Sequence, residues 1–372
     1  MNHQWLENLE VNLNSFIDNL KKDKKYTYFP VLKNKTKFGY SGELGFTCFV
    51  LKIFYITNRW ENLSNLERKE WISFINSFQS DDSGFPINSY IDLNYLEEFN
   101  NPVITVRFKN ILKVILKKLK LSKRLTREEY LHTSIKAESK QAISTIYQVG
   151  YRNDKRYTDF PTSRTQIHQY LESLNWTKPW DAGAQFSSLC LFTQTQLEDG
   201  NLKEEAKKEL VSYINNLADD STGSYFKGSV NSQKEIINGA MKVISGLDWI
   251  DEEIKYPEKL IDYCLKTKPD EDGCDLVDIT YVLHMCLKQS NYKQEEVKNY
   301  YSTILDIIKN HSYHNGGFSY FGRKSQTHYY GVEISTGENE PDLHGTVLLV
   351  WAISMISQHI SLPTSHWRVL KP

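Results

Sequence analysis

A loop near the C-terminus carries the densest group of side chains that could take part in chemistry. Residues 322–341 lack helical periodicity and combine titratable groups with two adjacent tyrosines. Such a group beside a cavity mouth suits substrate binding, and a plain solvated loop is the alternative. Arg323 and Lys324 could meet a diphosphate, a carboxylate or a sugar acid, and the residue types do not choose among these. The candidate substrate-binding residues of the loop are Arg323, Lys324, His328, Tyr329, Tyr330, Glu338 and Glu340.

The five cysteines do not form a recognisable motif. Their number is odd, and none belongs to a Cys-x-x-Cys pair, so we expect no disulfide scaffold. Cys48 and Cys190 lie in apolar runs, where a free cysteine usually acts as a small buried side chain. His284 and Cys286 are two residues apart, so on a helix they point in different directions and we expect both in the core.

Three amphipathic segments each run into a turn that contains glycine and an aromatic residue. The segments are 71–79, 211–217 and 304–310, and the turns are 81–85, 219–225 and 314–318. Asp, Asn and Gly tolerate left-handed or turn geometry and therefore end the helices. This internal repeat predicts a protein built from successive helix and turn units.

Other segments are more uniformly apolar and contain small residues, which is the pattern of helices buried on most sides. They span 43–56, 182–193, 234–247, 276–287 and 343–356, with a sixth near 140–149. Charged amphipathic segments such as 203–217 and 295–309 would instead face solvent. Inner and outer helices would thus alternate. We predict an all-α chain in which residues 1–372 form a single α/α toroid, a ring of about six inner and outer helix pairs.

Charge and hydropathy limit the classes of partner. The 45 Lys and Arg residues nearly balance 46 Asp and Glu, for a net charge of -1, so no overall field favours nucleic acid. No phosphate-cradling glycine loop, serine nucleophile elbow or zinc-protease histidine motif is evident. The N-terminus lacks a basic start with an apolar run, and no apolar stretch approaches transmembrane length. We therefore expect a cytoplasmic protein.

One segment departs from the ring pattern, because 106–124 mixes many lysines with apolar residues at helical spacing. A packed outer helix, inserted within about 100–130, is one interpretation. A helix that lies on an anionic membrane surface is the other, and such peripheral contact would suit a lipid-like substrate.

The repeats resemble those of the terpenoid cyclase and protein prenyltransferase toroids. Repeats of that superfamily pair an outer helix with a turn of glycine and an aromatic residue, and the QW motif of the cyclases places a glutamine a few residues ahead. Gln79 with Gly84 and Phe85 looks like a degenerate copy, whereas the other two repeats lack the glutamine. The resemblance covers about 39–356 and reports fold rather than chemistry.

The resemblance also implies an acid at the start of one inner helix. In squalene-type cyclases the pattern is Asp-x-Asp-Asp-Thr, and its middle aspartate donates the initiating proton. Asp278 matches that aspartate and Thr280 matches the threonine. Leu276 and Ile279 replace the flanking acids, so strongly acidic catalysis is not implied by the motif as it stands here.

In prenyltransferases the same helix start carries Asp-x-Cys, which binds zinc together with a distant histidine. Asp278 and His344 match two of those ligands, but Thr280 stands at the cysteine position. Cys274, four residues before Asp278, would share a helix face with it if the helix began early, and zinc suits a thiolate, carboxylate and imidazole set. The alternatives are that Gly273 and Cys274 sit in a turn, and that His344 caps its own helix.

The first functional hypothesis is an enzyme whose central cavity accepts an isoprenoid or similarly bulky small molecule, without a cofactor other than a possible zinc ion. Asp278 would be the acid or metal ligand, with His344 opposite. Tyr281, Tyr329 and Tyr330 could face a developing cation.

Two further hypotheses stay open. Other α/α barrels use paired carboxylates for glycoside hydrolysis or lyase reactions, and Asp278 with Glu338 or Glu340 would be such a pair here. A non-catalytic binding protein that keeps the ring is the third, and it is consistent with the degenerate motifs.

Overall fold

The computed structural model describes residues 4–81, 84–101, 125–230 and 232–372. Within these ranges the regular structure is helical apart from two small hairpins, which confirms the all-α prediction. No described helix has the length and apolar character needed to cross a membrane. The basic segment 106–124 lies outside the described residues.

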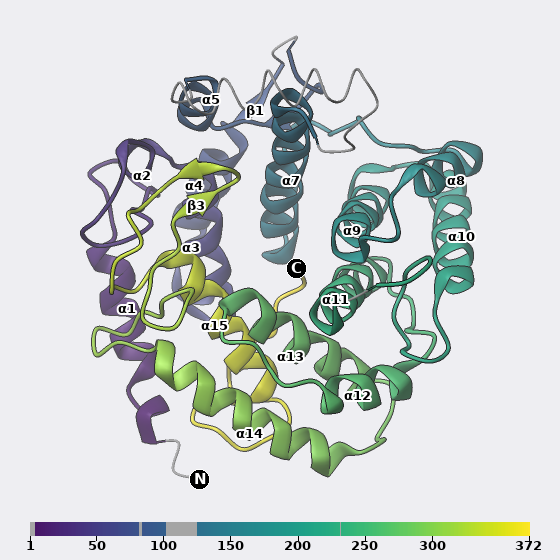
Figure 1. Cartoon of the computed structure of the whole chain (residues 1–372). Coiled ribbons are helices and arrows are strands. Elements are labelled where there is room, and N and C mark those ends of the chain that lie inside the picture. The colour runs from purple at the N-terminus through teal and green to yellow at the C-terminus, as the bar shows by residue number, and fades with distance from the viewer. Residues whose placement is uncertain (1–3, 82–83, 102–124, 231) are drawn as a thin grey trace.

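Six largely buried helices occupy the interior (Figure 1). They are α3 (Leu44–Ile56), α7 (Arg127–Gln148), α9 (Pro179–Gln196), α11 (Gln233–Trp249), α13 (Gly273–Leu287) and α15 (Leu343–Ile356). Each helix contacts the next in this order, and α15 contacts α3, so the series of contacts closes on itself. Their apolar composition explains this placement, because such helices must be covered on most sides. Five of the six lie within a few residues of their predicted ranges.

The exception is α7, which begins 13 residues before the predicted segment at 140–149. A capping box starts it: the hydroxyl of Thr126 accepts the Glu129 N–H, and the Glu129 carboxylate accepts the Thr126 N–H. The first half of the helix carries many charges and therefore has the sequence pattern of a solvent-facing helix.

Amphipathic helices lie outside the inner six. They are α1 (Leu9–Asn19), α4 (Asn65–Asn76), α8 (Arg164–Ser173), α10 (Gly200–Leu217), α12 (Pro257–Lys266) and α14 (Gln294–His311). α4, α10 and α12 contact α3, α9 and α13 respectively, whereas α14 contacts both α13 and α15. Short elements complete the helical set: η1 (Gln4–Leu6), α2 (Lys37–Ser41), η2 (Arg59–Asn62) and α5 (Leu93–Asn100).

The turns of the predicted repeats are closed by short antiparallel pairing. β1 (Gln79–Ser80) pairs with β2 (Ser89–Tyr90), and single bridges join Ala218 to Tyr225 and Ser312 to Phe318. The first repeat helix ends at Asn76, so Gln79 belongs to β1 and not to the helix as predicted. Its side-chain amide donates to the carbonyl of Lys155 at 2.7 Å and accepts the Lys155 N–H at 2.9 Å. Gln79 thus ties this turn to the chain that follows α7.

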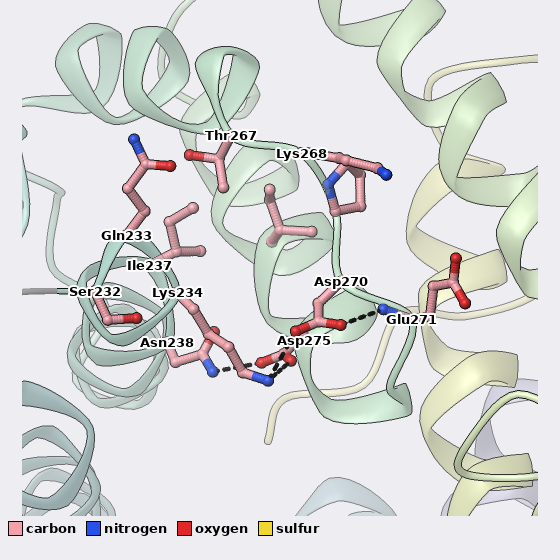
Figure 2. A pocket seen from close by; sticks show the side chains of 12 residues that line it. Ser232, Gln233, Lys234, Ile237, Asn238, Thr267, Lys268, Asp270, Glu271 and Asp275 are labelled. Carbon is pink, nitrogen blue, oxygen red and sulfur yellow. Dashed lines mark hydrogen bonds and ion pairs between the residues drawn. The ribbon is translucent and has the colours of Figure 1, made fainter.

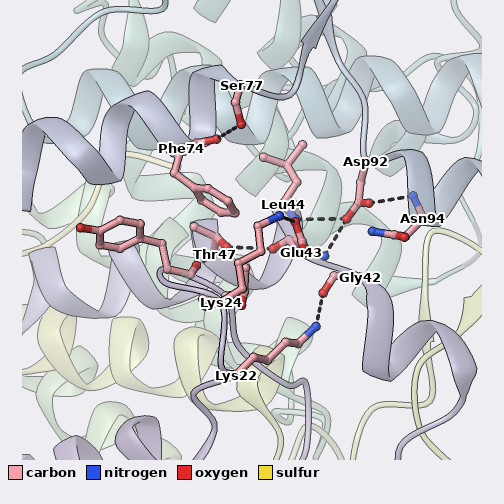
Figure 3. Close-up of polar contacts among 12 residues, drawn as sticks. Lys22, Lys24, Gly42, Glu43, Leu44, Thr47, Phe74, Ser77, Asp92 and Asn94 are labelled. Carbon is pink, nitrogen blue, oxygen red and sulfur yellow. Dashed lines mark hydrogen bonds and ion pairs between the residues drawn. The ribbon is translucent and has the colours of Figure 1, made fainter.

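The N-terminal end of α3 is fixed by one buried carboxylate (Figure 3). Asp92 accepts the N–H groups of Glu43 and Leu44 at 2.6 and 3.1 Å with one oxygen, and that of Asn94 at 3.0 Å with the other. Asp92 therefore caps α3 and α5 together. Lys22 donates to two carbonyls just before α3, each at 2.6 Å.

The last residues of the chain cross the opposite end of the inner helices. The N–H of Arg368 donates to the carbonyl of Ile56, and the N–H of Lys371 donates to the side chain of Gln148. The indole of Trp249 donates to the carbonyl of the final residue at 2.5 Å. These three partners are the last residues of α3, α7 and α11, so the C-terminal segment links α11 to α3 and α7, with which α11 is not paired in the closed series.

Candidate functional site

Two charged side chains face each other across the contact between α11 and α13. The Lys242 ammonium lies 4.0 Å from Oδ1 of Asp278, whose side chain is 2% exposed. Oδ2 of Asp278 has no hydrogen-bond partner among the described residues. Burial raises the pKa of Asp278 to about 7, although Lys242 opposes the shift. Asp278 can therefore exchange a proton near neutral pH.

Lys242 and Asp278 form the innermost contact in a row of polar contacts between α11 and α13. On α11, Lys234, Asn238 and Lys242 follow one another at four-residue spacing and share a face. Lys234 and Asn238 contact Asp275 on α13, the latter with a hydrogen bond of 2.7 Å, and Lys242 contacts Asp278 one turn further along. These polar contacts join successive turns of α11 to successive turns of α13.

The outer end of this row of polar contacts lines a pocket of about 640 Å³ (Figure 2). The Lys234 ammonium lies 3.2 Å from Asp270 and 3.0 Å from Asp272, and it also forms an ion pair with Asp275. These three aspartates bring carboxylate oxygens within 4.8 Å of one another. Because Lys234 forms an ion pair with each of them, we interpret the cluster as an ion-pair network that joins α11 to the start of α13.

The proposed zinc ligands are arranged differently. α13 begins at Gly273, with Asp272 as its N-cap, so the expectation of a turn at Gly273 and Cys274 is wrong. The early start places Cys274 and Asp278 one turn apart on the same helix. Burial, followed by the charge of Asp278, raises the pKa of Cys274 to about 12, which keeps it as a thiol. Among the described residues, these two and His344 do not form a group with ligand atoms within 4.8 Å.

His344 lies in the first turn of α15, between two aromatic rings. Its ring stacks on Phe49 with 4.9 Å between centroids and on Tyr320 with 5.3 Å. Burial, followed by the charges of Lys52 and Lys242, lowers the pKa of His344 to about 4, so the imidazole is neutral at pH 7. Asp342, not His344, caps the helix. The charge of Lys242 thus acts on both Asp278 and His344, and within the described structure no hydrogen bond joins these two side chains directly.

Two tyrosines of the candidate set are packed inside the protein. Tyr329 lies on β3 (His328–Tyr329), which pairs with β4 (Val332–Glu333), and its hydroxyl donates to Glu138 at 3.0 Å. Tyr281 is buried and its hydroxyl donates to Asp248 at 3.0 Å. Tyr330 is half-buried, and its carbonyl accepts the hydroxyl of Tyr95.

The charged candidate residues of the loop differ in burial. Arg323, Lys324, His328 and Glu338 are exposed. Glu340 is buried and accepts two backbone N–H groups, from Lys33 at 2.9 Å and Asn34 at 3.0 Å. Glu340 therefore anchors the N-terminal segment, and neither glutamate forms a hydrogen bond or ion pair with Asp278 in the described part of the chain.

Three lysines of the inner helices were not predicted from the sequence, and two of them, Lys52 and Lys242, lower the pKa of His344. Lys52, Lys140 and Lys242 lie on α3, α7 and α11, and all three are half-buried. A signal was present, because Lys52 is the single charged residue of the helix Leu44–Ile56. A lone lysine in an inner helix is costly to bury and therefore marks a position worth testing.

No protein-family model, curated protein or solved structure matches the chain. Its function is therefore inferred from its own residues.

Proposed function

We propose that the protein is an α/α toroid of the terpenoid cyclase and prenyltransferase type, and that it is an enzyme. The closed series of six inner helices, the amphipathic helices outside them and the repeated helix and turn units support this fold. Its substrate would be a bulky small molecule held in the space that the inner helices surround.

The observation that carries the proposal is the state of the Asp278 carboxyl. Asp342 and Asp92, two buried carboxylates with structural roles, have both oxygens occupied, whereas Oδ2 of Asp278, like Oε2 of Glu138, has no hydrogen-bond partner among the described residues. Asp342 accepts backbone N–H groups with Oδ1 and with Oδ2, and Asp92 does the same. Asp278 leaves Oδ2 without a partner, although burial of an unsatisfied polar atom costs roughly 1–3 kcal/mol. A substrate atom is a natural partner for that oxygen.

The geometry suits general acid catalysis by Asp278. The protonated carboxyl would donate its proton to the oxygen of a leaving group. The carboxylate left behind would then be stabilised by the ammonium of Lys242 at 4.0 Å. Neutral His344 would contribute a hydrogen bond rather than a charge.

A product screen tests this role. The purified protein is incubated with isoprenoid alcohols, isoprenoid diphosphates and polyenes, and products are detected by mass spectrometry. We expect turnover of at least one class, and a loss of about 10²-fold to 10⁴-fold in Asp278→Asn. Asp306→Asn, an exposed position on α14, is the matched control and should retain full activity. Wild-type protein that converts none of these compounds, or Asp278→Asn with unchanged turnover, would contradict the proposal.

A further inference from the structure

A buried glutamate joins two basic side chains across the contact between α8 and α10. Glu209 on α10 is only 7% exposed. One of its carboxylate oxygens accepts the Nε–H of Arg164 at 2.8 Å, and the other lies 2.8 Å from Nδ1 of His168. Arg164 and His168 are four residues apart on α8, so they share one face of that helix. Both oxygens of the buried carboxylate are thereby paired.

Glu209 determines which nitrogen of His168 carries the hydrogen. Although burial opposes the shift, the hydrogen bonds from His168 and Arg164 lower the pKa of Glu209. The ionised carboxylate can only accept, so Nδ1 of His168 donates to it and the neutral ring keeps its lone pair on Nε2. Neither this Nε2 nor the two Nη groups of Arg164 form a hydrogen bond with a described residue. Both side chains are more than half exposed.

Arg164 and His168 line a pocket of about 460 Å³ between the two helices. This volume lies in the usual range of small-molecule sites. The buried ring of Tyr213 also lines the pocket and lies against His168, with 5.8 Å between the ring centroids. The remaining wall carries neutral polar side chains that are exposed and form no hydrogen bond with a described residue: Thr165, Gln169, Ser212 and Asn216.

The charges around this pocket match a ligand with one negative charge. Arg164 and Glu209 cancel, and Glu172, one turn beyond His168 on α8, is already paired with Lys227 at 3.0 Å. An anion that reaches Nε2 favours uptake of a proton by His168, because the imidazolium can donate from both nitrogens. The site then carries one net positive charge. A carboxylate supplies the single opposite charge, and its planar pair of oxygens fits the guanidinium.

We propose that this pocket binds a hydroxylated carboxylic acid of the sugar-acid class. Arg164 binds the carboxylate through its Nη groups, and protonated His168 donates to it from Nε2. The neutral polar side chains of the wall bind the hydroxyl groups, and Glu209 acts as a positioning residue that holds both basic side chains. The pocket lies between two outer helices and shares no residue with the surroundings of Asp278, so this inference goes beyond the proposed function.

Titration calorimetry with D-glucuronate as the probe tests the site. D-glucose is the ligand control, because it keeps the hydroxyl groups and lacks the carboxylate. We expect saturable binding of glucuronate at one site per chain, and a Kd weaker by about tenfold or more in Arg164→Gln and in His168→Gln. Arg156→Gln removes an exposed arginine that is paired with Glu198 at 2.8 Å, so it is the matched control and should bind like wild type.

Two further measurements separate a binding role from a structural one. Arg164→Lys keeps a charge beside Glu209 but lacks the planar guanidinium, so it should unfold at the wild-type temperature and still bind more weakly. Titrations in buffers of different ionisation enthalpy should show proton uptake on binding in wild type and none in His168→Gln.

The outcomes also separate this site from the role of Asp278. Asp278→Asn should bind glucuronate like wild type, so either proposal can fail without the other. Absence of saturable binding, equal affinity for glucose and glucuronate, or unchanged binding in Arg164→Gln would overturn the carboxylate site. Preference for glucose 6-phosphate over glucuronate would also overturn it, because the ligand group would then be a phosphate.

Discussion

The ammonium of Lys242 lies 4.0 Å from Oδ1 of Asp278, and these two side chains come from neighbouring inner helices that have no other charged pair this deep in their contact. The distance allows an ion pair when Asp278 is deprotonated. It does not satisfy Oδ2, which is buried and unpartnered in the described structure. Burial therefore favours the neutral acid of Asp278 over the carboxylate, although Lys242 opposes this preference.

The first prediction concerns stability and pH at Asp278. Burial raises its pKa from 3.8 to about 7, so between these values the folded chain holds a proton that the unfolded chain releases. The stability contributed by Asp278 therefore falls as the pH rises through this range. Relative to wild type, Asp278→Asn should gain up to about 4 kcal/mol from the low to the high end of the range. Urea unfolding at several pH values measures this gain, and a difference independent of pH would contradict it.

The second prediction concerns the unpaired amine of Lys52. Burial, with the charge of Lys242, lowers its pKa from 10.5 to about 8, so the protonated amine destabilises the fold fully below pH 8. That cost disappears as the pH rises toward 10.5. Lys52→Met should therefore stabilise the unliganded protein by about 1–3 kcal/mol at neutral pH, with a smaller gain near pH 10. Denaturation curves that show Lys52→Met to be less stable at neutral pH would indicate a partner for Lys52.

The third prediction concerns Gly45, which lies against the hydroxyl of Tyr329. A Cβ atom at Gly45 would overlap the Tyr329 side chain and move it away from Glu138. Gly45→Ala should cost about 1–3 kcal/mol, the usual effect of overpacking. Gly200→Ala is the control, because an added Cβ there meets nothing within 4 Å. Equal thermal stability of the two variants would show that Tyr329 is not held as described.

The fourth prediction concerns the C-terminal segment. Removal of residues 368–372 takes away buried Leu370 and the hydrogen bonds to the ends of α3, α7 and α11. We expect a loss of about 2–4 kcal/mol. Trp249→Phe removes one of those hydrogen bonds and should cost about 1 kcal/mol. Truncated protein with wild-type thermal stability would mean that the segment does not link the helices in solution.

Sequence periodicity predicted most of the helices because apolar and amphipathic patterns are local properties. The range 343–356 coincides with α15, whereas the charged first half of α7 concealed a helix that tertiary contacts bury. The lysines of the interior could not be grouped from sequence. Lys52 and Lys242 are 190 positions apart, and the contacts that close the series of inner helices have no local sequence signature.

The loop candidates show a second limit. A run of titratable residues predicts neither which side chain is anchored nor which is exposed. Glu340 is held by backbone N–H groups of Lys33 and Asn34, more than 300 positions away, and this contact has no local sequence signature. Glu338, two residues earlier, is exposed.

The protonation state of Asp278 tests the central claim most directly. Carboxyl-carbon NMR of protein labelled with ¹³C-aspartate, with Asp278→Asn to assign the resonance, follows this single group through a pH titration. We expect a midpoint near 7 in the unliganded protein. A midpoint at the ordinary aspartate value near 4 would show that Asp278 carries no proton at neutral pH and would contradict its role as the acid.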